Sequence, residues 1–364
     1  MVVGTRPEAI KLSPVAHALA ALGEAPRLLV TGQHPGLELA DHALEGFAAT
    51  PLCCPGQPNP MLHADLVRSA LKRLLPMDPP ELLIVQGDTS SALGGALAAR
   101  ELGISLAHVE AGLRSHDPNL PWPEEENRVT IDRLSDLLFA PTSANGANLR
   151  RDRVPGQVHV TGNSGIDALA EIVGQVPVKP RRRWPWHPFT LLVTCHRREN
   201  WGAGLDGVAK AILALSSQRV EADVLLPPNP MVTQRMTKLL GGQRRIRLIP
   251  PLSHRATIAA MREADLVLSD SGGMQEEAPA LGVPLLILRD KTERPEGLAS
   301  GTMALVGTDP DRIIAAIEQL RRNRAAMAAM RRPCLPFGDG RAAARIARHC
   351  LAFLEETAAV RESR

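Results

Sequence analysis

Short apolar runs alternate with helical patterns along the chain, and this alternation restricts the fold more than any other feature. Ten runs predict strands: RLLVTG from Arg27, ELLIVQGD from Glu81, ISLAHVE from Ile104, DLLFAPT from Asp136, QVHVTGN from Gln157, TLLVTCH from Thr190, ADVLLPP from Ala222, IRLIPPL from Ile246, ADLVLSD from Ala264 and PLLILRD from Pro284. Helical spacing recurs between them, as at Leu12, Val15, Leu19 and Leu22, and at Leu62, Leu66, Ala70 and Leu74. The alternation predicts parallel sheets covered by helices on both faces.

The chain divides near its middle. A Pro-, Arg- and Trp-rich stretch over residues 174–188 interrupts the alternation, which then resumes. A length of 364 residues suits two domains better than one hydrophobic core. We therefore expect one α/β domain over residues 1–165 and a second over 166–340. A final helix over 341–364 can pack back on either half, and we assign it to the N-terminal domain.

Composition excludes several classes of function. The 42 Lys and Arg residues are balanced by 39 Asp and Glu residues, so the chain has no strong excess charge for a polyanion. Aromatic residues make up only 2%, which is too few for base stacking on single-stranded nucleic acid. We therefore expect no nucleic-acid partner.

Cysteine usage and hydropathy indicate the compartment. Five Cys without a CxxC pair resemble neither a disulfide framework nor a zinc site. The stretch MVVGTRPEAIKL lacks the pattern of a secretory signal, and no run of about 18 apolar residues occurs. We expect a cytoplasmic protein with no membrane partner.

The stretch SDSGGMQEEAPAL predicts an anion site. An apolar run from Leu266 to Leu268 predicts a strand, and a helical pattern opens at Gly272. A strand-to-helix turn directs free N–H groups and the positive end of the helix dipole outward, and glycine lets a bulky anion approach the backbone. Either a phosphate cradle or an ordinary tight turn fits this segment taken alone.

Polar clusters recur where strand patterns stop. They are GTRPEAIK at Gly4, QGDTS at Gln86, HVEAGLR at His108, CHRREN at Cys195 and SDSGG at Ser269. Their cationic side chains can bind anions: Arg6, Lys11, His196, Arg197 and Arg198. The carboxylates of Asp88 and Glu110 in these clusters, and those of Glu124 and Glu277 outside them, can move protons or hold hydroxyls. This combination at the edges of two sheets suggests a nucleotide sugar.

No cofactor is expected. No cluster has metal-ligand spacing, no G-x-G-x-x-G follows a strand, and GDTSSALGG lacks the Lys-Ser/Thr of a P-loop. We expect chemistry without a cofactor or a metal.

Taken together, the motifs resemble the non-hydrolysing, bacterial UDP-N-acetylglucosamine 2-epimerases. The segments that carry the resemblance are GTRPEAIK, QGDTSSAL, HVEAGLRS, PWPEEENR, VTGN with IDAL, TCHRREN, SDSGGMQEEAPALGVP and TERPEGLASGT, in the order of that family. The resemblance implies two Rossmann-like domains facing a cleft, the glycosyltransferase B arrangement, with UDP bound by the second. It also implies interconversion of UDP-GlcNAc and UDP-ManNAc by elimination and re-addition of UDP through 2-acetamidoglucal, and a homodimer.

The resemblance also assigns roles to individual residues. Positions matching the family's catalytic residues are Asp88, Glu110, Glu124 and His196, with His196 beside the pyrophosphate. Positions matching its substrate contacts are Arg6, Lys11, Ser271, Gly272, Gly273, Glu277 and Arg294. Ser271, Gly272 and Gly273 would cradle the diphosphate, and Glu277 would accept hydrogen bonds from the ribose. Which carboxylate serves which face of C2 is left open.

Three other residues in these motifs are given structural roles. We expect Arg114 and Glu125 to tie loops together, and Glu276 to be a solvated helix residue.

The sequence departs from the family in three places. Pro227 stands where many relatives have a His, so that side chain cannot donate a hydrogen bond. The region near the uracil often carries an aromatic residue in relatives, whereas this chain has His254 and Thr257. Residues matching the effector UDP-GlcNAc site of some relatives are Gln33, His34 and Arg68. Pro35 and Gly36 follow where longer polar side chains are usual, which puts effector activation in question.

Two alternatives stay open beside the epimerase. One is the hydrolysing relative, which releases UDP and free N-acetylmannosamine. The other is a nucleotide-sugar binding protein that has lost catalysis, although the retained carboxylates argue against it. A glycosyltransferase of the same architecture is the prediction from fold alone.

Overall fold

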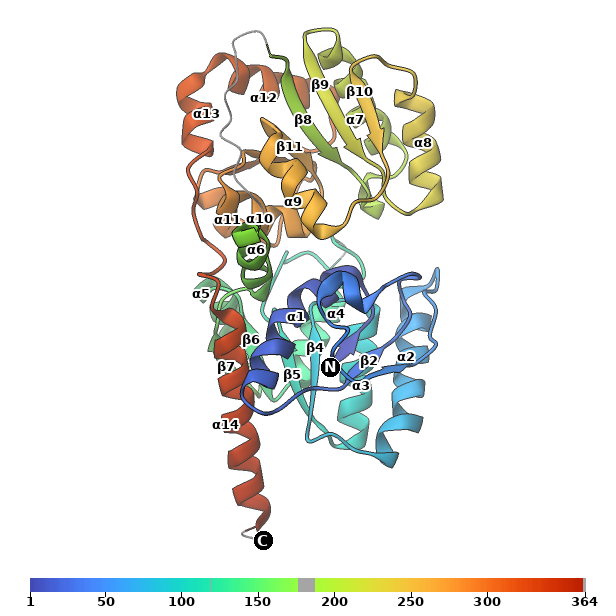
Figure 1. Cartoon of the computed structure of the whole chain (residues 1–364), viewed down its shortest axis with the longest axis vertical. Coiled ribbons are helices and arrows are strands. Elements are labelled where there is room, and N and C mark those ends of the chain that lie inside the picture. The colour runs from blue at the N-terminus through green and yellow to red at the C-terminus, as the bar shows by residue number, and fades with distance from the viewer. Residues whose placement is uncertain (119, 176–186, 363–364) are drawn as a thin grey trace. The chain divides into compact units, whose positions relative to one another are not determined.

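The computed structural model describes residues 1–118, 120–175 and 187–362, and it separates into two compact units. Unit 1 comprises Met1–Ala170 and Phe337–Arg364, and unit 2 comprises Glu171–Pro336 (Figure 1). The unit boundaries therefore differ by a few residues from those expected after 165 and 340. Residues 176–186 of the expected linker lie outside the described part of the chain.

Unit 1 contains two parallel sheets that lie next to each other, with β1 of the first beside β4 of the second. The first has the order β1-β2-β3, and the second has the order β4-β5-β6-β7. Their bounds are β1 Val2–Val3, β2 Leu28–Val30, β3 Ala49–Pro51, β4 Leu82–Gln86, β5 Ser105–Val109, β6 Leu137–Ala140 and β7 Gln157–Val160. β1 contacts β4, so the strands follow the order 3-2-1-4-5-6-7, which begins as in a Rossmann fold.

Helices cover both faces of these sheets. They are α1 Arg6–Ala21, α2 Pro60–Leu74, α3 Ser90–Leu102, α4 Glu124–Leu134, α5 Ser143–Arg151 and α14 Ala342–Glu362, with the short helices η1 Leu39–His42 and η2 Leu75–Met77. A further helix, α6 Ser164–Gln175, begins in unit 1 and ends in unit 2. Neighbouring Val2 and Val3 point to opposite faces and enter different cores. Val3 packs in the core that α1 and α14 close, and Val2 packs in the core that α2 and α3 close.

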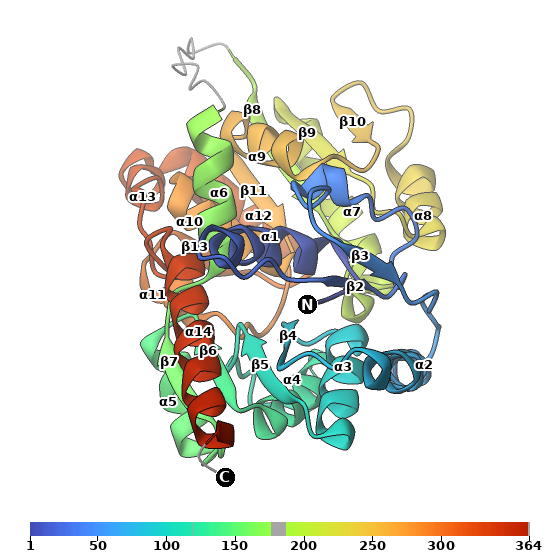
Figure 2. The same cartoon turned by 60° about the horizontal axis from the view of Figure 1, so that its bottom comes forward.

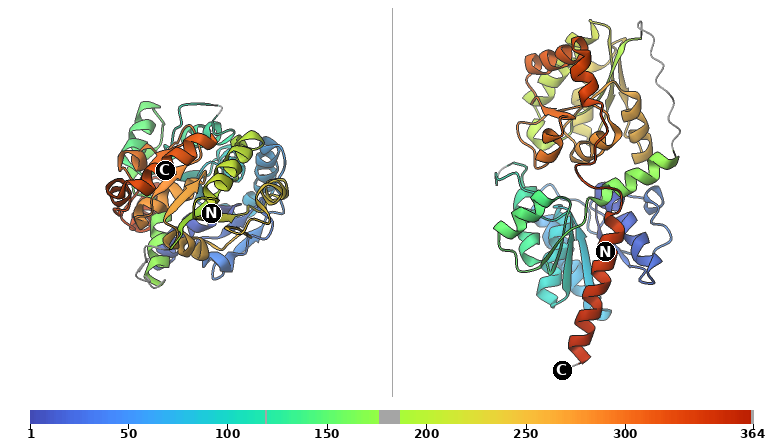
Figure 3. Two further views of the ribbon diagram at one scale, coloured as in Figure 1. Left: turned by 90° about the horizontal axis from the view of Figure 1, so that it is seen from above. Right: turned by 90° about the vertical axis from the view of Figure 1, so that its left-hand side faces the viewer.

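The C-terminal helix α14 belongs to unit 1. Its buried residues Ala343, Ile346, Ala347 and Cys350 join the core cluster that contains Leu12 of α1. α14, the helix that leads to the C-terminus in Figure 3, packs against α1. Among the described residues, no helix is sufficiently long and apolar to span a bilayer.

The helical spacing in α2 identified the helix correctly, although only part of the repeat is buried. Leu62 and Leu66 are 50% and 38% exposed. The residues that α2 buries against its unit include His63, Val67 and Leu71. The repeat is therefore exposed at Leu62 and Leu66 but packed at Ala70, and the packed side also contains His63.

Unit 2 contains one six-stranded parallel sheet with the order β10-β9-β8-β11-β12-β13 (Figure 2). The strands are β8 Phe189–Thr194, β9 Val220–Leu225, β10 Ile246–Ile249, β11 Leu266–Ser269, β12 Leu285–Ile287 and β13 Met303–Leu305. Counted from β8, this order is 3-2-1-4-5-6, the Rossmann order again. The two units are therefore both Rossmann-like α/β units, as expected.

The helices of unit 2 complete its layers. They are α7 Ala203–Ser216, α8 Pro230–Leu240, α9 His254–Glu263, α10 Gly272–Leu281, α11 Pro295–Ala299, α12 Pro310–Arg322 and α13 Arg324–Met330, with the short helix η3 Arg198–Asn200. One core cluster joins the sheet to α7, α8, α12 and α13. All ten strands predicted from the sequence are present, and β1, β3 and β13 are additional short strands.

Candidate active site

The polar clusters lie at the carboxyl ends of parallel strands, as the sequence predicted. In unit 1, residues 4–11 follow β1, 86–90 close β4 and 108–114 close β5. In unit 2, residues 195–200 follow β8 and 269–273 close β11. Because the strands of each sheet are parallel, each sheet gathers its clusters at one edge, where α/β proteins bind ligands.

Glu110 lies directly after β5 and is held by two other elements of unit 1. Its backbone has a φ of +71°, an uncommon conformation for a residue other than glycine. Lys11 Nζ of α1 donates to Glu110 Oε1 over 2.7 Å, and Gln86 Nε2 of β4 donates to Oε2. Lys11 and Glu110 are both buried. The carboxylate is thus fixed between a cation and an amide.

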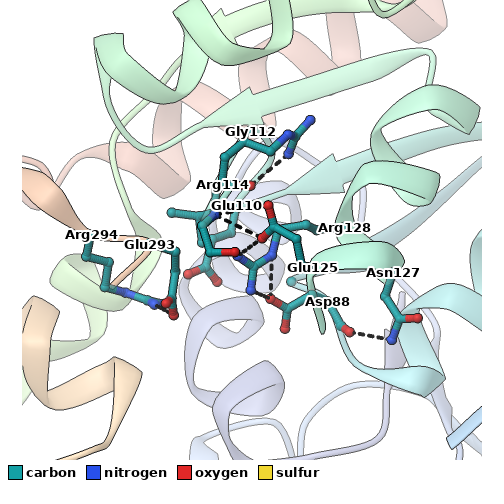
Figure 4. Close-up of polar contacts among 12 residues, drawn as sticks. Asp88, Glu110, Gly112, Arg114, Glu125, Asn127, Arg128, Glu293 and Arg294 are labelled. Atoms are coloured by element: carbon teal, nitrogen blue, oxygen red, sulfur yellow. Dashed lines mark hydrogen bonds and ion pairs between the residues drawn. The ribbon is translucent and has the colours of Figure 1, made fainter. Parts of the chain in front are cut away.

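Asp88 has a more open environment (Figure 4). Arg128 of α4 donates to Asp88 Oδ2 from Nε over 2.9 Å and also from Nη2. Asn127 Nδ2 donates to the Asp88 backbone carbonyl over 2.9 Å. The Asp88 side chain is 24% exposed, whereas that of Arg128 is 3% exposed. A buried guanidinium therefore holds one oxygen of a carboxylate that remains accessible to solvent.

The sequence reasoning missed Arg128. It lies three residues after Glu125 in PWPEEENR, and this helical spacing could have indicated the ion pair between Arg128 Nη1 and Glu125 Oε2, at 2.9 Å. Glu125 also accepts from the backbone N–H groups of Ser115 and His116, over 3.0 and 3.1 Å. Glu125 thus ties a loop to α4, as predicted.

A second buried network supports the backbone before Asp88. The ring nitrogens of His108 contact Asp132 Oδ1, at 2.7 Å, and the Gly87 carbonyl, at 2.9 Å. Arg114 pairs with Asp132 Oδ2 at 2.7 Å and with Asp152 Oδ2 at 2.7 Å. Arg114 therefore ties loops together, as predicted, and His108 fixes the residue that precedes Asp88.

Glu124 and Arg6 both lie at helix starts of unit 1. Glu124 is half-buried and is the first residue of α4, so its negative charge is favourable at the helix N-terminus. Arg6 is the exposed first residue of α1, and its backbone N–H donates to His34 Nδ1 over 3.5 Å. Burial, followed by the charge of Arg6, lowers the pKa of His34.

The three residues expected at an effector site have separate contacts. Gln33 Oε1 accepts from Ser91 Oγ over 2.7 Å, close to His34 in the chain. Arg68 instead pairs with Asp65 and Glu101, at 3.1 and 3.0 Å, between α2 and α3. Pro35 and Gly36 form a turn in which Gly36 has a φ of +71°.

In unit 2, Asp270 organises the loop after β8. Asp270 Oδ2 accepts from the backbone N–H groups of His196 and Arg197 and from Asn200 Nδ2, each over 2.9 Å. Asp270 is fully buried, while the His196 side chain is 43% exposed with Nδ1 3.4 Å from Asp270 Oδ1. Burial, followed by the charge of Asp270, raises the pKa of the Cys195 thiol well above its usual value. His196 is therefore presented to solvent on a fixed backbone.

The anion site expected from SDSGG has the predicted local structure. Helix α10 begins at Gly272, with Ser271 as its N-cap, and the Ser271 side chain makes no capping hydrogen bond. A Cβ added at Gly272 would lie 3.1 Å from Arg294 Nη1 and 3.3 Å from Arg197 Nη2. Two guanidinium groups therefore accompany the helix N-terminus, a favourable place for an anion.

Glu276 is buried, which corrects the expectation that it is solvated. Its exposure is 2%, and its Oε1 accepts from Arg294 Nε over 2.7 Å. Arg294 also pairs with Glu293, and Glu293 Oε2 pairs with Arg289 Nη1 at 2.8 Å. The charge of Arg294 explains the burial, because a carboxylate loses hydration at lower cost beside a fixed cation.

The other face of α10 is open. A Cβ added at Gly273 would meet no atom within 4 Å. Glu277, one helical turn further, shares this face, and its Oε1 lies 2.6 Å from His254 Nε2 of α9. The structure thus brings together Ser271, the two glycines and Glu277 at one helix, with His254 beside them.

Pro227 and Thr257, where the sequence departs from the family pattern, each make one local contact. The Pro227 carbonyl accepts from Thr233 Oγ1 over 2.7 Å, and Thr257 Oγ1 donates to the Ser253 carbonyl over 3.0 Å. Within the described ranges, no group of three or more His, Cys, Asp and Glu side chains has an arrangement suited to a metal ion.

Comparison with known proteins gives one consistent result. The family described as UDP-N-acetylglucosamine 2-epimerase matches residues 18–351. The UDP-N-acetylglucosamine 2-epimerase of Escherichia coli strain K12 is 38% identical over 364 residues, spanning 95% of this chain and 96% of that protein. The crystal structure of the Neisseria meningitidis UDP-GlcNAc 2-epimerase bound to UDP-GlcNAc has a TM-score of 0.89 at 35% identity, covering 96% of this chain and 98% of that one.

An archaeal structure agrees with this likeness. The Methanocaldococcus jannaschii UDP-GlcNAc 2-epimerase, in complex with UDP-GlcNAc and UDP, has a TM-score of 0.84 at 31% identity. The match covers 96% of this chain and 98% of that one, so it extends over both units.

The buried charge network of unit 2 predicts a large effect at Glu276. Glu276→Ala removes one carboxylate from the buried Arg294 and should lower the free energy of unfolding by about 3 kcal/mol, measured by chemical denaturation. Asp206→Ala is the matched control, because Asp206 pairs with Arg235 through side chains that are 31% and 42% exposed and should change little. Equal stability of Glu276→Ala and the parent would mean that Glu276 is the solvated residue first expected.

Proposed function

Because the chain belongs to the UDP-N-acetylglucosamine 2-epimerase family, we propose that it interconverts UDP-GlcNAc and UDP-ManNAc at C2 without an added cofactor. The observation that carries the proposal is that each unit offers one of two chemistries at its own strand ends. Unit 1 offers the carboxylates Asp88 and Glu110, each oriented by a cationic partner. Unit 2 offers the helix N-terminus at Gly272 with arginines beside it.

The C2 proton of the sugar is not acidic, so direct deprotonation and reprotonation is a poor route. In the proposed reaction a carboxylate removes the proton from C2 while the bond between C1 and the UDP oxygen breaks. This elimination gives 2-acetamidoglucal and UDP. Re-addition then delivers a proton to the other face of C2 as the UDP oxygen attacks C1. The site must supply acid/base groups and stabilise the leaving diphosphate.

The residues divide between these tasks. The proton transfers are assigned to Asp88, Glu110 and Glu124, and His196 stabilises the leaving diphosphate. The substrate contacts assigned to both units are Arg6, Lys11, Ser271, Gly272, Gly273, Glu277 and Arg294. The accessibility of Asp88 supports its role, since a base must reach its proton, and the Arg128 contact fixes its direction.

The setting of the enzyme is part of the proposal. The five cysteines are free thiols, as expected of a protein in a reducing cytoplasm. We assign it a homodimeric state on the strength of the family resemblance. The effector site proposed from the resemblance comprises Gln33, His34 and Arg68, and Arg68 pairs with Asp65 and Glu101 in this structure.

Product analysis tests the proposal directly. Incubation of the purified protein with UDP-GlcNAc, followed by NMR, should give a mixture of UDP-GlcNAc and UDP-ManNAc without accumulating UDP. Free N-acetylmannosamine with an equal amount of UDP would identify the hydrolysing relative instead. Binding of UDP-GlcNAc without any product would identify a protein that has lost catalysis.

Amide variants test the acid/base assignments. Asp88→Asn, Glu110→Gln and Glu124→Gln remove the proton-accepting form while keeping shape. Each should lower turnover by roughly 100-fold or more and leave UDP affinity nearly unchanged, because other residues hold the leaving group. Glu126→Gln is the matched control on α4, since Glu126 is exposed and has no assigned role. A variant that keeps parental turnover would show that its residue is structural.

A glycine variant tests the diphosphate cradle. Val at Gly273 would meet no protein atom at its Cβ, so the fold should tolerate it, while the side chain would occupy the open face of α10. Calorimetry should show a loss of UDP affinity of about 10-fold or more, equivalent to about 1.4 kcal/mol. Gly46→Val, where the Cβ is also unobstructed, should bind UDP as the parent does. Unchanged UDP affinity in a folded Gly273→Val protein would contradict the cradle.

A further inference from the structure

His254 and Glu277 form a largely buried pair at the open face of α10. His254 is the first residue of α9, and its Nε2 lies 2.6 Å from Glu277 Oε1. Each side chain is 12% exposed. A carboxylate oxygen accepts, so Nε2 carries the hydrogen of this bond. The imidazole therefore determines where Glu277 Oε1 points.

The second carboxylate oxygen of Glu277 is differently placed. Among the residues that the structure describes, none donates a hydrogen bond to Glu277 Oε2. Glu277 shares its helix face with Gly273, where an added Cβ would meet only open space. At Glu277, Oε1 already accepts a hydrogen bond from His254, whereas Oε2 can accept one from a ligand that lies over Gly273.

The spacing along α10 suits a ribose phosphate. The helix N-terminus at Gly272 and Gly273 attracts phosphate, and Glu277 lies about one turn further, roughly 5 Å along the axis. A carboxylate with an available oxygen accepts hydrogen bonds from hydroxyl groups. In a nucleotide, the ribose hydroxyls and the phosphates are separated by a distance comparable to this one helical turn.

We propose that His254 is a positioning residue for the ribose contact: by holding Glu277 Oε1, it directs Oε2 to the ribose hydroxyls of the bound nucleotide. The inference rests on the proposed function, in which Glu277 contacts the ribose. It gives His254 a role other than stacking on the uracil, since its ring nitrogen is engaged with Glu277. His254 acts on the ligand through another residue, so its effect falls on binding and on recognition of the ribose.

The test compares UDP with 2′-deoxy-UDP, which lacks one ribose hydroxyl. Calorimetry should show that the parent binds UDP about 10-fold more tightly than 2′-deoxy-UDP. His254→Leu should bind UDP about 10-fold more weakly and lose most of this preference, because Glu277 is no longer fixed. His254→Gln should retain the preference, since its amide nitrogen can donate from nearly the same position as Nε2.

A neighbouring residue on α9 provides the matched control. Arg255 is exposed and its Nη1 contacts Gln175 Oε1 at 3.1 Å, away from Glu277. Arg255→Ala should keep the parental affinity and preference. Circular dichroism of each variant checks the fold, and the His254→Gln result decides the question if His254→Leu fails to fold.

Each remaining outcome overturns a defined part of the account. A parent that does not bind UDP would contradict the proposed function. A parent that prefers UDP, together with a folded His254→Leu that keeps the same preference, would overturn the inference and leave the proposed function intact. Loss of preference in His254→Gln as well as His254→Leu would mean that the imidazole acts by packing, which also overturns it.

Discussion

Parallel strand pairing is the constraint on which the rest of this structure depends. Within each sheet every strand runs in the same direction, so every strand-to-helix connection leaves from the same edge. Five short polar segments that are far apart in the sequence are thereby gathered at a few sheet edges. Each segment follows a buried strand, and the strand fixes the backbone position of the first residues after it. Glu110 after β5 and Asp270 after β11 are examples.

Buried partners orient the functional side chains at these edges. Glu110 is held by Lys11 and Gln86, and Asp88 is held by Arg128. Asp270 holds the backbone on either side of the His196–Arg197 peptide bond. Such groups cost free energy to bury, and paired contacts offset that cost while fixing direction. Preorganised charges of this kind are what an elimination with a leaving diphosphate requires.

Local sequence patterns predicted the parts of the fold that depend on local structure. Apolar runs identified ten strands, and glycines after a strand identified the start of α10. Short strands such as β3 escaped prediction because Ala49–Pro51 is exposed in part and lacks an apolar run. In α2 the spacing of apolar residues identified the helix but not its buried side chains, because Leu62 and Leu66 are exposed whereas His63 is packed.

In the candidate site, too, local features were predictable and tertiary contacts were not. Residue types within each motif were predictable, since anion binding and proton transfer require particular side chains. Partners from other elements were not, because nothing near Glu276 indicates that Arg294 covers it, and nothing near Glu277 indicates His254. These contacts depend on tertiary packing, which brings separate helices and loops together.

The central claim is that C2 loses its proton to the protein and regains one from it. The most direct measurement is NMR of the nucleotide sugars after incubation of the protein with UDP-GlcNAc in D2O. Elimination and re-addition predict deuterium at C2 of UDP-ManNAc and, with time, at C2 of the remaining UDP-GlcNAc. UDP-ManNAc that forms with its original hydrogen at C2 would contradict the account.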